Sequence, residues 1–202
     1  MKLIDCFLYH NEDLVLDIRL NTLNEHVDQF VIVESNFDHQ GNKKRLNFDF
    51  ERFKKFKHKI NYQVIEKFPG DISNWERENY QRNFIENGIA DCDDNDYIII
   101  SDVDEIPDLK KIKNLQNYKF TVFEQKMFYY KFNLYYENFE WFGSKAIRKK
   151  NFVSPQWLRN IKSKNYPIWR VDVFFSKTKY HNIKFIDDGG WHFTCIKSPE
   201  EV

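Results

Sequence analysis

The stretch Tyr97-Ile98-Ile99-Ile100-Ser101-Asp102-Val103-Asp104 decides the fold that we predict, because a continuous apolar run is followed directly by acidic residues. Such a run is typical of a parallel strand buried on both faces. In an open parallel sheet, ligands bind outside the carboxyl ends of the strands, and Asp102 and Asp104 lie at such an end. The stretch therefore predicts an α/β protein with a ligand site where this strand ends.

The residues before this stretch predict a βαβ unit. Leu3 to Tyr9 has the pattern of a short buried strand, and Asn11, followed by two acidic residues, suits the N-cap of a helix. Apolar residues then recur at helical spacing: Leu16, Leu20, Leu23 and Val27. Phe30 to Glu34 is a second apolar run that ends in a carboxylate, so strand, helix and strand follow one another.

The segments between these strands and Tyr97 predict two more helices and a third strand. Asp49 to Lys59 is rich in Phe and basic residues and is predicted to be helical, and Ile60 to Ile65 alternates like a strand. Ser73 and Glu76 have the spacing of a capping box. Gly88 stands where a helix often ends on a left-handed residue, so we predict a helix over Trp75 to Asn87.

The second half of the chain has a different pattern. Asp108 to Leu115 is predicted to be helical, and the sequence from Phe120 to Tyr136 is β-like. The later segments carry turn residues and no long helical pattern. We therefore expect a mostly parallel sheet flanked by helices, followed by a more irregular, β-rich part.

Length and charge limit the possible functions. The chain has 202 residues, which suits one α/β domain. Lys+Arg and Asp+Glu are both 31, so no overall charge favours nucleic acid or an anionic membrane, and an anionic ligand must be bound locally. Aromatic residues make up 18% of the chain, which suits sugar stacking but is explained more simply by core packing.

The cysteines and the start of the sequence predict a cytoplasmic protein. Cys6, Cys92 and Cys195 are far apart and form no C-x-x-C motif, so neither a disulfide framework nor a zinc site is expected. The first residues lead almost directly into strand-like sequence, without the apolar run of a signal peptide or a transmembrane segment.

Asp102 and Asp104 are the candidate metal ligands. Carboxylates at i and i+2 in extended backbone point to the same side, and hard oxygen ligands suit Mn²⁺ or Mg²⁺ with diphosphate oxygens completing the shell. Such a cation would neutralise a departing diphosphate. The same D-x-D pattern also occurs in solvated loops, and the isoleucine run before it is what favours the metal interpretation.

The capped helix supplies candidate ligand-binding residues. At 3.6 residues per turn, Arg77 and Gln81 fall on the stripe that faces the protein. Their polar groups need partners there, either a bound ligand or a buried carboxylate such as Glu34. Glu78 and Arg82 are predicted to be an ordinary surface i,i+4 pair.

Polar residues also interrupt an apolar pattern near the end of the chain. His192 is a candidate third metal ligand, although a His between Trp and Phe is more often packed in a core. Asp188 or Asp187 is the candidate general base for an acceptor hydroxyl, and the competing interpretation is an Asp-Gly turn. Lys145 is a weaker candidate for a phosphate contact.

Four blocks of the sequence, in order, resemble glycosyltransferase family 17. They are Val31-Ile32-Val33-Glu34-Ser35-Asn36, the helix with Arg77-Glu78 and Gln81-Arg82, Ile99 to Pro107 with the D-x-D pattern, and Gly189-Gly190-Trp191-His192-Phe193. The resemblance runs from about Leu3 to Thr194.

The resemblance implies a GT-A type fold, a nucleotide-sugar donor, expected to be UDP-N-acetylglucosamine, a glycan acceptor, Mn²⁺ or Mg²⁺, and inversion at the anomeric carbon. Matched residue by residue, the resemblance implies that Asp102 and Asp104 bind metal and donor, that Arg77 and Gln81 lie beside the nucleotide, and that His192 belongs to the C-terminal block. Glu34 is a weaker candidate for a contact with uracil or ribose. On this basis residues 1–118 are the donor-binding half of one domain. Residues 119–202 are the acceptor-side half, which is expected to be incomplete because the chain stops at Ser198 to Val202.

Two other functions remain open at this point. A non-catalytic protein that binds nucleotide sugars or carbohydrate is compatible with the early end of the chain and the uncertain base. A phosphohydrolase of the haloacid dehalogenase kind also places D-x-D after a strand. Here, however, Glu105-Ile106-Pro107 follows the two aspartates in place of the Gly-Thr expected for that class of enzyme. The two aspartates also do not lie near the start of the chain.

Overall fold

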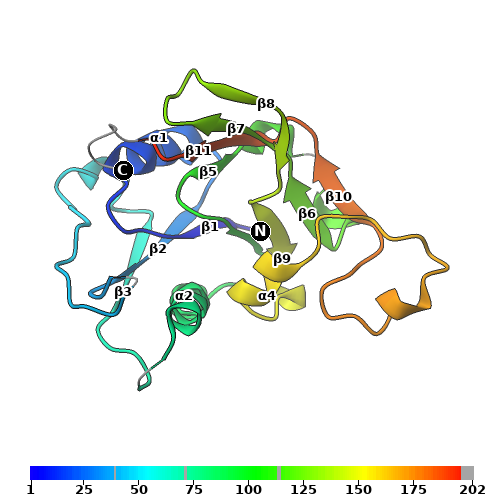
Figure 1. Ribbon diagram of the computed structural model, residues 1–202, viewed down its shortest axis with the longest axis horizontal. Coiled ribbons are helices and arrows are strands. Elements are labelled where there is room, and N and C mark those ends of the chain that lie inside the picture. The colour runs from blue at the N-terminus through cyan, green and yellow to red at the C-terminus, as the bar shows by residue number, and fades with distance from the viewer. Residues whose placement is uncertain (39, 71, 113–114, 197–202) are drawn as a thin grey trace.

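The main feature of the protein is a seven-stranded mixed sheet, seen in a computed structural model that describes residues 1–38, 40–70, 72–112 and 115–196. The strand order is β10-β6-β9-β4-β1-β2-β3 (Figure 1). The bounds are β1 Leu3–Leu8, β2 Gln29–Ser35, β3 Ile60–Ile65, β4 Tyr97–Ile100, β6 Phe120–Phe123, β9 Lys145–Arg148 and β10 Ile183–Ile186.

Strands β1 to β4 form the parallel part of this sheet. β1 pairs in parallel with both β2 and β4, and β2 pairs in parallel with β3. The four residues of β4 are all buried, as expected for a strand covered on both faces. β9 then runs antiparallel between β4 and β6, and β10 is parallel to β6. The predicted α/β class with a largely parallel sheet is confirmed.

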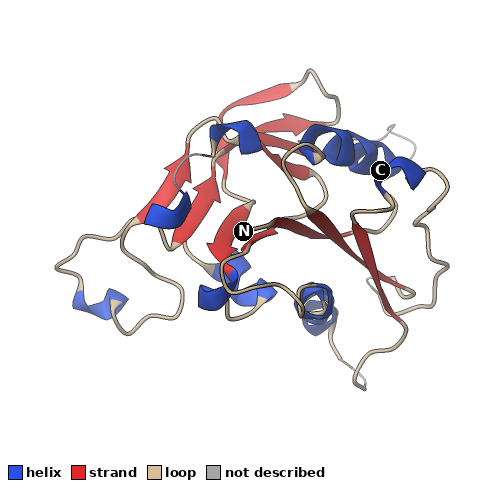
Figure 2. Cartoon of the chain, turned by 180° about the vertical axis from the view of Figure 1, so that it is seen from behind, coloured by secondary structure: helices blue, strands red, loops and turns tan. Residues whose placement is uncertain are grey.

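A second, four-stranded mixed sheet has the order β5-β11-β7-β8. Its strands are β5 Glu105–Pro107, β7 Gln125–Tyr129, β8 Tyr135–Trp141 and β11 Gly190–Thr194. β11 pairs antiparallel with β5 and parallel with β7. Figure 2 shows this sheet beside the main one. The pairing of β11 with β5 brings the C-terminal block of the sequence next to the residues that follow Asp102 and Asp104.

Helices cover both faces of the main sheet. On one face, α1 (Asp13–Leu23) buries Leu16, Leu20 and Leu23 in a cluster that also contains Phe7 and Phe30. On the other face lie α2 (Asn74–Asn83), α3 (Ile85–Gly88) and α4 (Pro155–Asn160) (Figure 1). In the described parts of the chain, no helix combines the length and the apolar character that a membrane crossing requires.

The predicted helix over Asp49 to Lys59 is wrong. The segment consists of turns and one short 3₁₀ helix, Lys54–Phe56. The Phe53 and Phe56 side chains of this segment, and Phe48 just before it, are nevertheless buried in the same cluster as α1. Packing of the aromatic side chains therefore fixes this segment without a regular helix. Similarly, Leu109–Lys111 and Leu115–Asn117 are 3₁₀ helices where a helix over Asp108 to Leu115 was predicted, and residues 113–114 lie outside the described residues.

The capping box is confirmed, but the helix that it starts is interrupted. The Ser73 side chain accepts from the Glu76 N–H, and the Glu76 carboxylate accepts from the Ser73 N–H. α2 ends at Asn83 with Phe84 as its C-cap, and the separate turn α3 follows. Gly88 is not a left-handed residue as predicted. A Cβ there would lie 2.3 Å from Cγ1 of Val31, so glycine is required by the close approach of α3 to β2.

Replacing Gly88 with alanine is expected to lower the free energy of unfolding by about 1–3 kcal/mol, because the added methyl group overpacks this contact. Urea unfolding of Gly88→Ala measures the effect. Trimming the opposing side chain in a Gly88→Ala/Val31→Ala double variant should cost less than the two single changes together. Simple additivity would show that the contact with Val31 is not the cause.

Candidate active site

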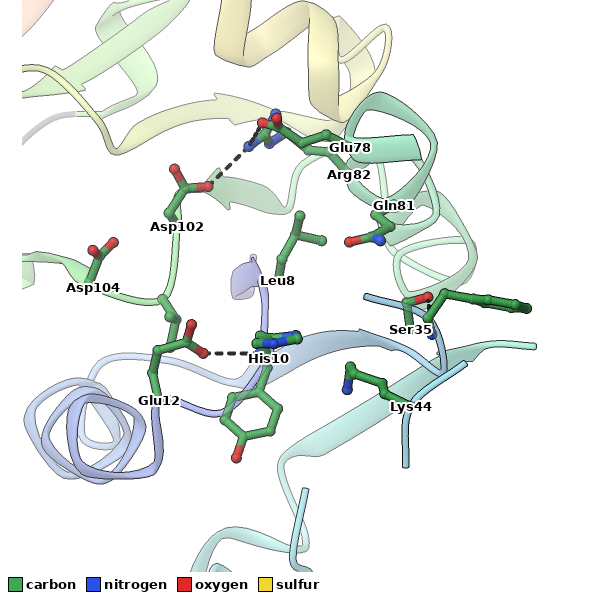
Figure 3. A pocket seen from close by; sticks show the side chains of 13 residues that line it. Leu8, His10, Glu12, Ser35, Lys44, Glu78, Gln81, Arg82, Asp102 and Asp104 are labelled. Atoms are coloured by element: carbon green, nitrogen blue, oxygen red, sulfur yellow. Dashed lines mark hydrogen bonds and ion pairs between the residues drawn. The ribbon is translucent and has the colours of Figure 1, made fainter. Parts of the chain in front are cut away.

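A polar pocket lies at the carboxyl ends of β1, β2 and β4, where the sequence predicted a ligand site. Its volume is about 360 Å³, within the range of small-molecule sites. Four segments line it: Leu8, Tyr9, His10 and Glu12 after β1; Ser35, Phe37 and Lys44 after β2; Glu78, Gln81 and Arg82 on α2; and Asp102, Val103 and Asp104 after β4 (Figure 3). The pocket is therefore open, polar and rich in charge.

The acidic loop after β4 is held in place by Arg19 of α1. This arginine is fully buried and pairs with Asp5 of β1 through two hydrogen bonds of 2.8 and 2.6 Å. Its Nη1 donates to the main-chain oxygens of Asp102, Val103 and Glu105 at 2.8–3.2 Å. Because these carbonyls belong to the loop that carries the predicted metal ligands, Arg19 is a positioning residue. The sequence interpretation did not identify it.

The Asp102 carboxylate lies between two arginines. Oδ1 is 3.2 Å from Nη2 of Arg82, and Oδ2 is 2.6 Å from Nη2 of Arg159. Burial alone would raise the pKa of Asp102, but Arg159 and then Arg82 hold it below its usual value. Arg159 also pairs with the buried Glu105, at 2.6 Å. The carboxylate is therefore ionised and engaged by protein cations.

Asp104 has a different environment, although it belongs to the same loop. Its Oδ2 lies 3.4 Å from Nε2 of His192, the one ion-pair partner of this carboxylate within the described residues. The His192 ring stacks on Trp141, with the ring centres 4.6 Å apart. The main-chain N–H of Phe193 donates to the Asp104 carbonyl at 2.9 Å. β11 thus brings His192 to the D-x-D loop, as its proposed role as a ligand requires.

The three predicted metal ligands do not form a closed cluster. No group of three or more His, Cys, Asp or Glu side chains is arranged to hold a metal ion within the residues described. The reason is the direction of Asp102, whose carboxylate is turned toward Arg82, while Asp104 lies apart from it (Figure 3). The oxygen of Asp104 and the adjacent His192 fit a divalent cation only if further ligands come from elsewhere, as diphosphate oxygens do.

Helix α2 presents a different arginine to the pocket from the one predicted. The predicted Glu78–Arg82 pair is present at 3.0 Å, but Arg82 is 5% exposed and also donates to Gln156 of α4 at 2.7 Å, so it is not a surface residue. Gln81 lines the pocket as expected. Arg77 does not belong to the lining, because its guanidinium packs against Gly41 and donates to Asn74 at 2.8 Å.

Glu34 lies behind the pocket wall and contacts the loop after β2. Its carboxylate is buried and accepts from Nζ of Lys44, the N–H groups of Asn47 and Phe48, and the Tyr62 hydroxyl, at 2.6–3.1 Å. Lys44 is itself part of the pocket lining. Glu34 therefore orients a pocket cation, whereas a direct contact with a nucleotide was predicted.

Lys145 does not reach the pocket. It is 5% exposed, and its Nζ donates to the main-chain oxygens of Arg159 and Ile161 at 2.7 and 2.5 Å. Burial, and then the charge of Arg159, lower the pKa of Lys145 to about 7. The residue therefore connects β9 to the end of α4, and the predicted phosphate contact has no support in its geometry.

Replacing Lys145 with methionine is expected to remove part of the pH dependence of folding. The pKa of lysine in an unfolded chain is about 10.4, whereas the pKa of Lys145 in the folded protein is about 7. Between these two pH values the unfolded state therefore binds more protons than the folded state. Stability from this group therefore rises with pH across that window, by at most about 1.4 kcal/mol per unit. Urea unfolding near pH 7 and pH 9 checks this, and identical pH profiles for wild type and Lys145→Met would contradict it.

The predicted bases Asp187 and Asp188 lie at a different place on the surface. Asp188 has a positive φ of 51° and pairs with Lys111 and Lys126 at 2.8 and 2.6 Å. These two lysines hold the pKa of Asp188 below its usual value. Asp187 lines a second depression together with Lys111. Neither aspartate lines the pocket of Asp102 and Asp104, so the arrangement matches the turn interpretation.

The fold and the pocket define an α/β protein with a charged site at the carboxyl edge of a parallel sheet. The model of glycosyltransferase family 17 matches residues 1–200, and the chain belongs to this family. The family that the four sequence blocks suggested is thereby confirmed.

The curated relatives that match include three mammalian proteins named beta-1,4-mannosyl-glycoprotein 4-beta-N-acetylglucosaminyltransferase. The human protein is 32% identical over 116 residues, which cover 52% of this chain and 22% of the human protein. The rat and mouse proteins are 32% and 31% identical over matches of the same extent. The match thus spans about a fifth of the length of these relatives.

Proposed function

We propose that this chain transfers N-acetylglucosamine from UDP-N-acetylglucosamine to a hydroxyl of a mannose-containing glycan, with a GT-A type arrangement of its donor site. Family membership supports sugar transfer, and the names of the mammalian relatives motivate the donor and the acceptor class. The single observation that carries the proposal is the charged pocket after β1, β2 and β4, where open parallel sheets bind ligands.

The pocket has the charges that a nucleotide diphosphate requires. Arg82 and Lys44 line it as cations, and both are oriented by buried partners. Guanidinium and ammonium groups bind phosphate oxygens through short charge-assisted hydrogen bonds. The side chains that face the developing negative charge of the departing diphosphate are thus held before the donor binds.

A divalent cation is part of this proposal, with Asp104 as its protein ligand and His192 beside it. When bound, Mn²⁺ or Mg²⁺ would neutralise diphosphate charge. Because the described residues form no cluster of three ligands, the protein alone is expected to bind the cation weakly, and the diphosphate must complete the site. Metal binding and donor binding should therefore depend on each other.

Thermal unfolding with UDP, UDP-N-acetylglucosamine, GDP and CDP, each with and without Mn²⁺, tests the donor site. A ligand at 100 times its dissociation constant adds about 2.7 kcal/mol, or roughly 5–10 °C in a domain of this size. We expect a Mn²⁺-dependent shift with the uridine ligands that is lost in Asp104→Ala, and little shift with Mn²⁺ alone. No shift with any nucleotide would overturn the proposal.

Transfer itself is tested with mannose-terminated oligosaccharides as acceptors. UDP release that depends on the acceptor supports the proposed transferase activity. NMR of the new glycosidic bond reports whether the anomeric configuration is inverted, as we propose. Inversion in one step requires a base at the acceptor hydroxyl. Asp187 and Asp188 do not line the pocket, so the base is expected among its own carboxylates.

The position of Asp187 and Asp188 outside the pocket favours one alternative function. A protein that binds the donor but transfers nothing would also have the pocket cations and would lack a positioned base. Tight, Mn²⁺-dependent UDP-N-acetylglucosamine binding without UDP release, over a broad set of acceptors, would support this alternative.

A further inference from the structure

A loop formed by residues 162–179 extends away from both sheets, between α4 and β10 (Figures 1 and 2). We call it the aromatic loop. Its large apolar side chains are among the most exposed of the protein: Ile168, Trp169, Val171, Phe174 and Phe175. Trp169 is 80% and Phe175 85% exposed. A cluster of this kind on a soluble surface usually marks an interaction site.

The backbone of the aromatic loop is anchored at its base. The Asn165 side chain exchanges two hydrogen bonds with the main chain of Ile183, at 2.9 and 2.6 Å. The Lys162 N–H donates to the Thr178 carbonyl at 2.8 Å, which joins the two ends of the loop. The indole N–H of Trp157 donates to the Lys177 carbonyl at 2.8 Å. The exposed apolar side chains are therefore presented by a closed and fixed loop.

The outer part of the loop is folded as well. It contains the 3₁₀ helix Val171–Val173, whose Val173 side chain is buried. Asp172 pairs with Arg170 and Lys179 at 2.7 and 2.9 Å. With Val173 turned inward and Asp172 neutralised, the outward-facing surface combines apolar side chains with cations.

The aromatic loop is also rich in cations. The loop contains five of them, Lys162, Lys164, Arg170, Lys177 and Lys179, against the single carboxylate of Asp172. The chain as a whole has a formal net charge of zero, so this concentration of positive charge is local. Lysine is depleted at protein–protein interfaces, whereas Lys with Trp and Phe is typical of segments that lie in the interface of an anionic bilayer.

We propose that the aromatic loop binds the surface of an anionic lipid bilayer, with Trp169, Phe174 and Phe175 entering the headgroup region and the lysines contacting acidic lipids. The loop projects away from both sheets (Figure 1), which suits penetration of a soft interface, whereas small molecules bind in concave sites. Trp at the level of the headgroups is a common anchor. The loop would thus hold the protein at a membrane surface.

Co-sedimentation of the full chain with vesicles tests the proposal. We expect binding to phosphatidylcholine vesicles that contain 30% phosphatidylserine, and little binding to pure phosphatidylcholine. Trp169→Ser and Phe175→Ser should each weaken partitioning about tenfold or more, because each removes a large apolar side chain from the interface. Lys162→Ala and Lys164→Ala should each weaken it about fivefold.

Trp75→Ser is the matched control, since Trp75 is 63% exposed on α2 and lies outside the loop. It should leave vesicle binding unchanged. Brominated lipids should quench the fluorescence of the wild type more than that of Trp169→Phe, which places the indole in the bilayer. These side chains are exposed, so unchanged thermal unfolding of the variants is expected to confirm that the fold is intact.

Three results would overturn the proposal. The first is equal vesicle binding by wild type and the Trp169→Ser/Phe175→Ser double variant. The second is no binding to anionic vesicles at low salt, where electrostatic attraction is strongest. The third is a concentration-dependent dimer in sedimentation velocity that the same double variant abolishes, because the loop would then bind a second copy of the chain.

Discussion

Replacing Arg19 with methionine is expected to lower the free energy of unfolding by about 3–5 kcal/mol, because it leaves the buried Asp5 carboxylate without its partner. Both side chains of this pair are fully buried. Three main-chain oxygens of the acidic loop also lose their donor. The variant should therefore bind UDP more weakly than its stability alone explains, since Asp102 and Asp104 stand on that loop.

Urea unfolding and UDP titration of the same preparations measure the two effects. Arg52→Met is the matched control, because Arg52 pairs with Asp13 at the start of α1 but each side chain is more than a third exposed. An exposed pair contributes no more than about 1 kcal/mol. If Arg19→Met is as mild as Arg52→Met, the buried pair does not hold the loop in the way described.

Replacing Arg82 with methionine is expected to weaken UDP binding by about ten- to hundredfold, the usual effect of losing hydrogen bonds to a charged group. This expectation follows from the proposed donor site, in which Arg82 is a pocket cation facing the diphosphate. Arg82 also joins α2 to Asp102 and to Gln156, so some loss of stability will accompany the change. Titration well below the unfolding temperature separates the two effects.

Arg77→Met provides the comparison, because it removes the same charge from the same helix without touching the pocket lining. We expect it to change UDP affinity less than twofold. Arg82→Lys should recover part of the affinity by restoring the cation. A larger loss with Arg77→Met than with Arg82→Met would reverse the assignment and favour the face of α2 that was predicted from the sequence.

The position of the charged pocket was predictable because it depends on local patterns. An apolar strand that ends in Asp102 and Asp104 needs no tertiary information to be placed at the carboxyl edge of a sheet. His192 was proposed from the sequence as a further ligand of the same cation, and the structure places its Nε2 3.4 Å from Oδ2 of Asp104. The face of α2 was less predictable, since helical periodicity fixes relative directions, whereas α4 and Asp102 decide that Arg82 is the arginine turned inward.

Other features depend on contacts between distant segments. Asp5 and Arg19 each interrupt an apolar pattern, in β1 and on the buried face of α1, which is a signal for a buried ion pair. The interpretation of α1 by its leucines alone did not use that signal. Asp188 pairs with Lys111 and Lys126, from two separate segments, and local spacing contains no information on these partners. The phenylalanines of Asp49 to Lys59 show that burial alone does not define a helix.

The order of strands in the main sheet has a consequence for how the chain acquires its structure. β4 pairs on one side with β1, more than ninety residues earlier in register, and on the other with β9, about fifty residues later. Contacts between such distant segments slow folding, because closing the long loop between them costs entropy before the contacts form. During synthesis, β4 must wait for β9 to leave the ribosome, and the sheet edge at β6 must wait for β10. In that interval, unpaired strand edges remain open to aggregation, so β4 and β6 depend on the later strands β9 and β10 to cover their edges.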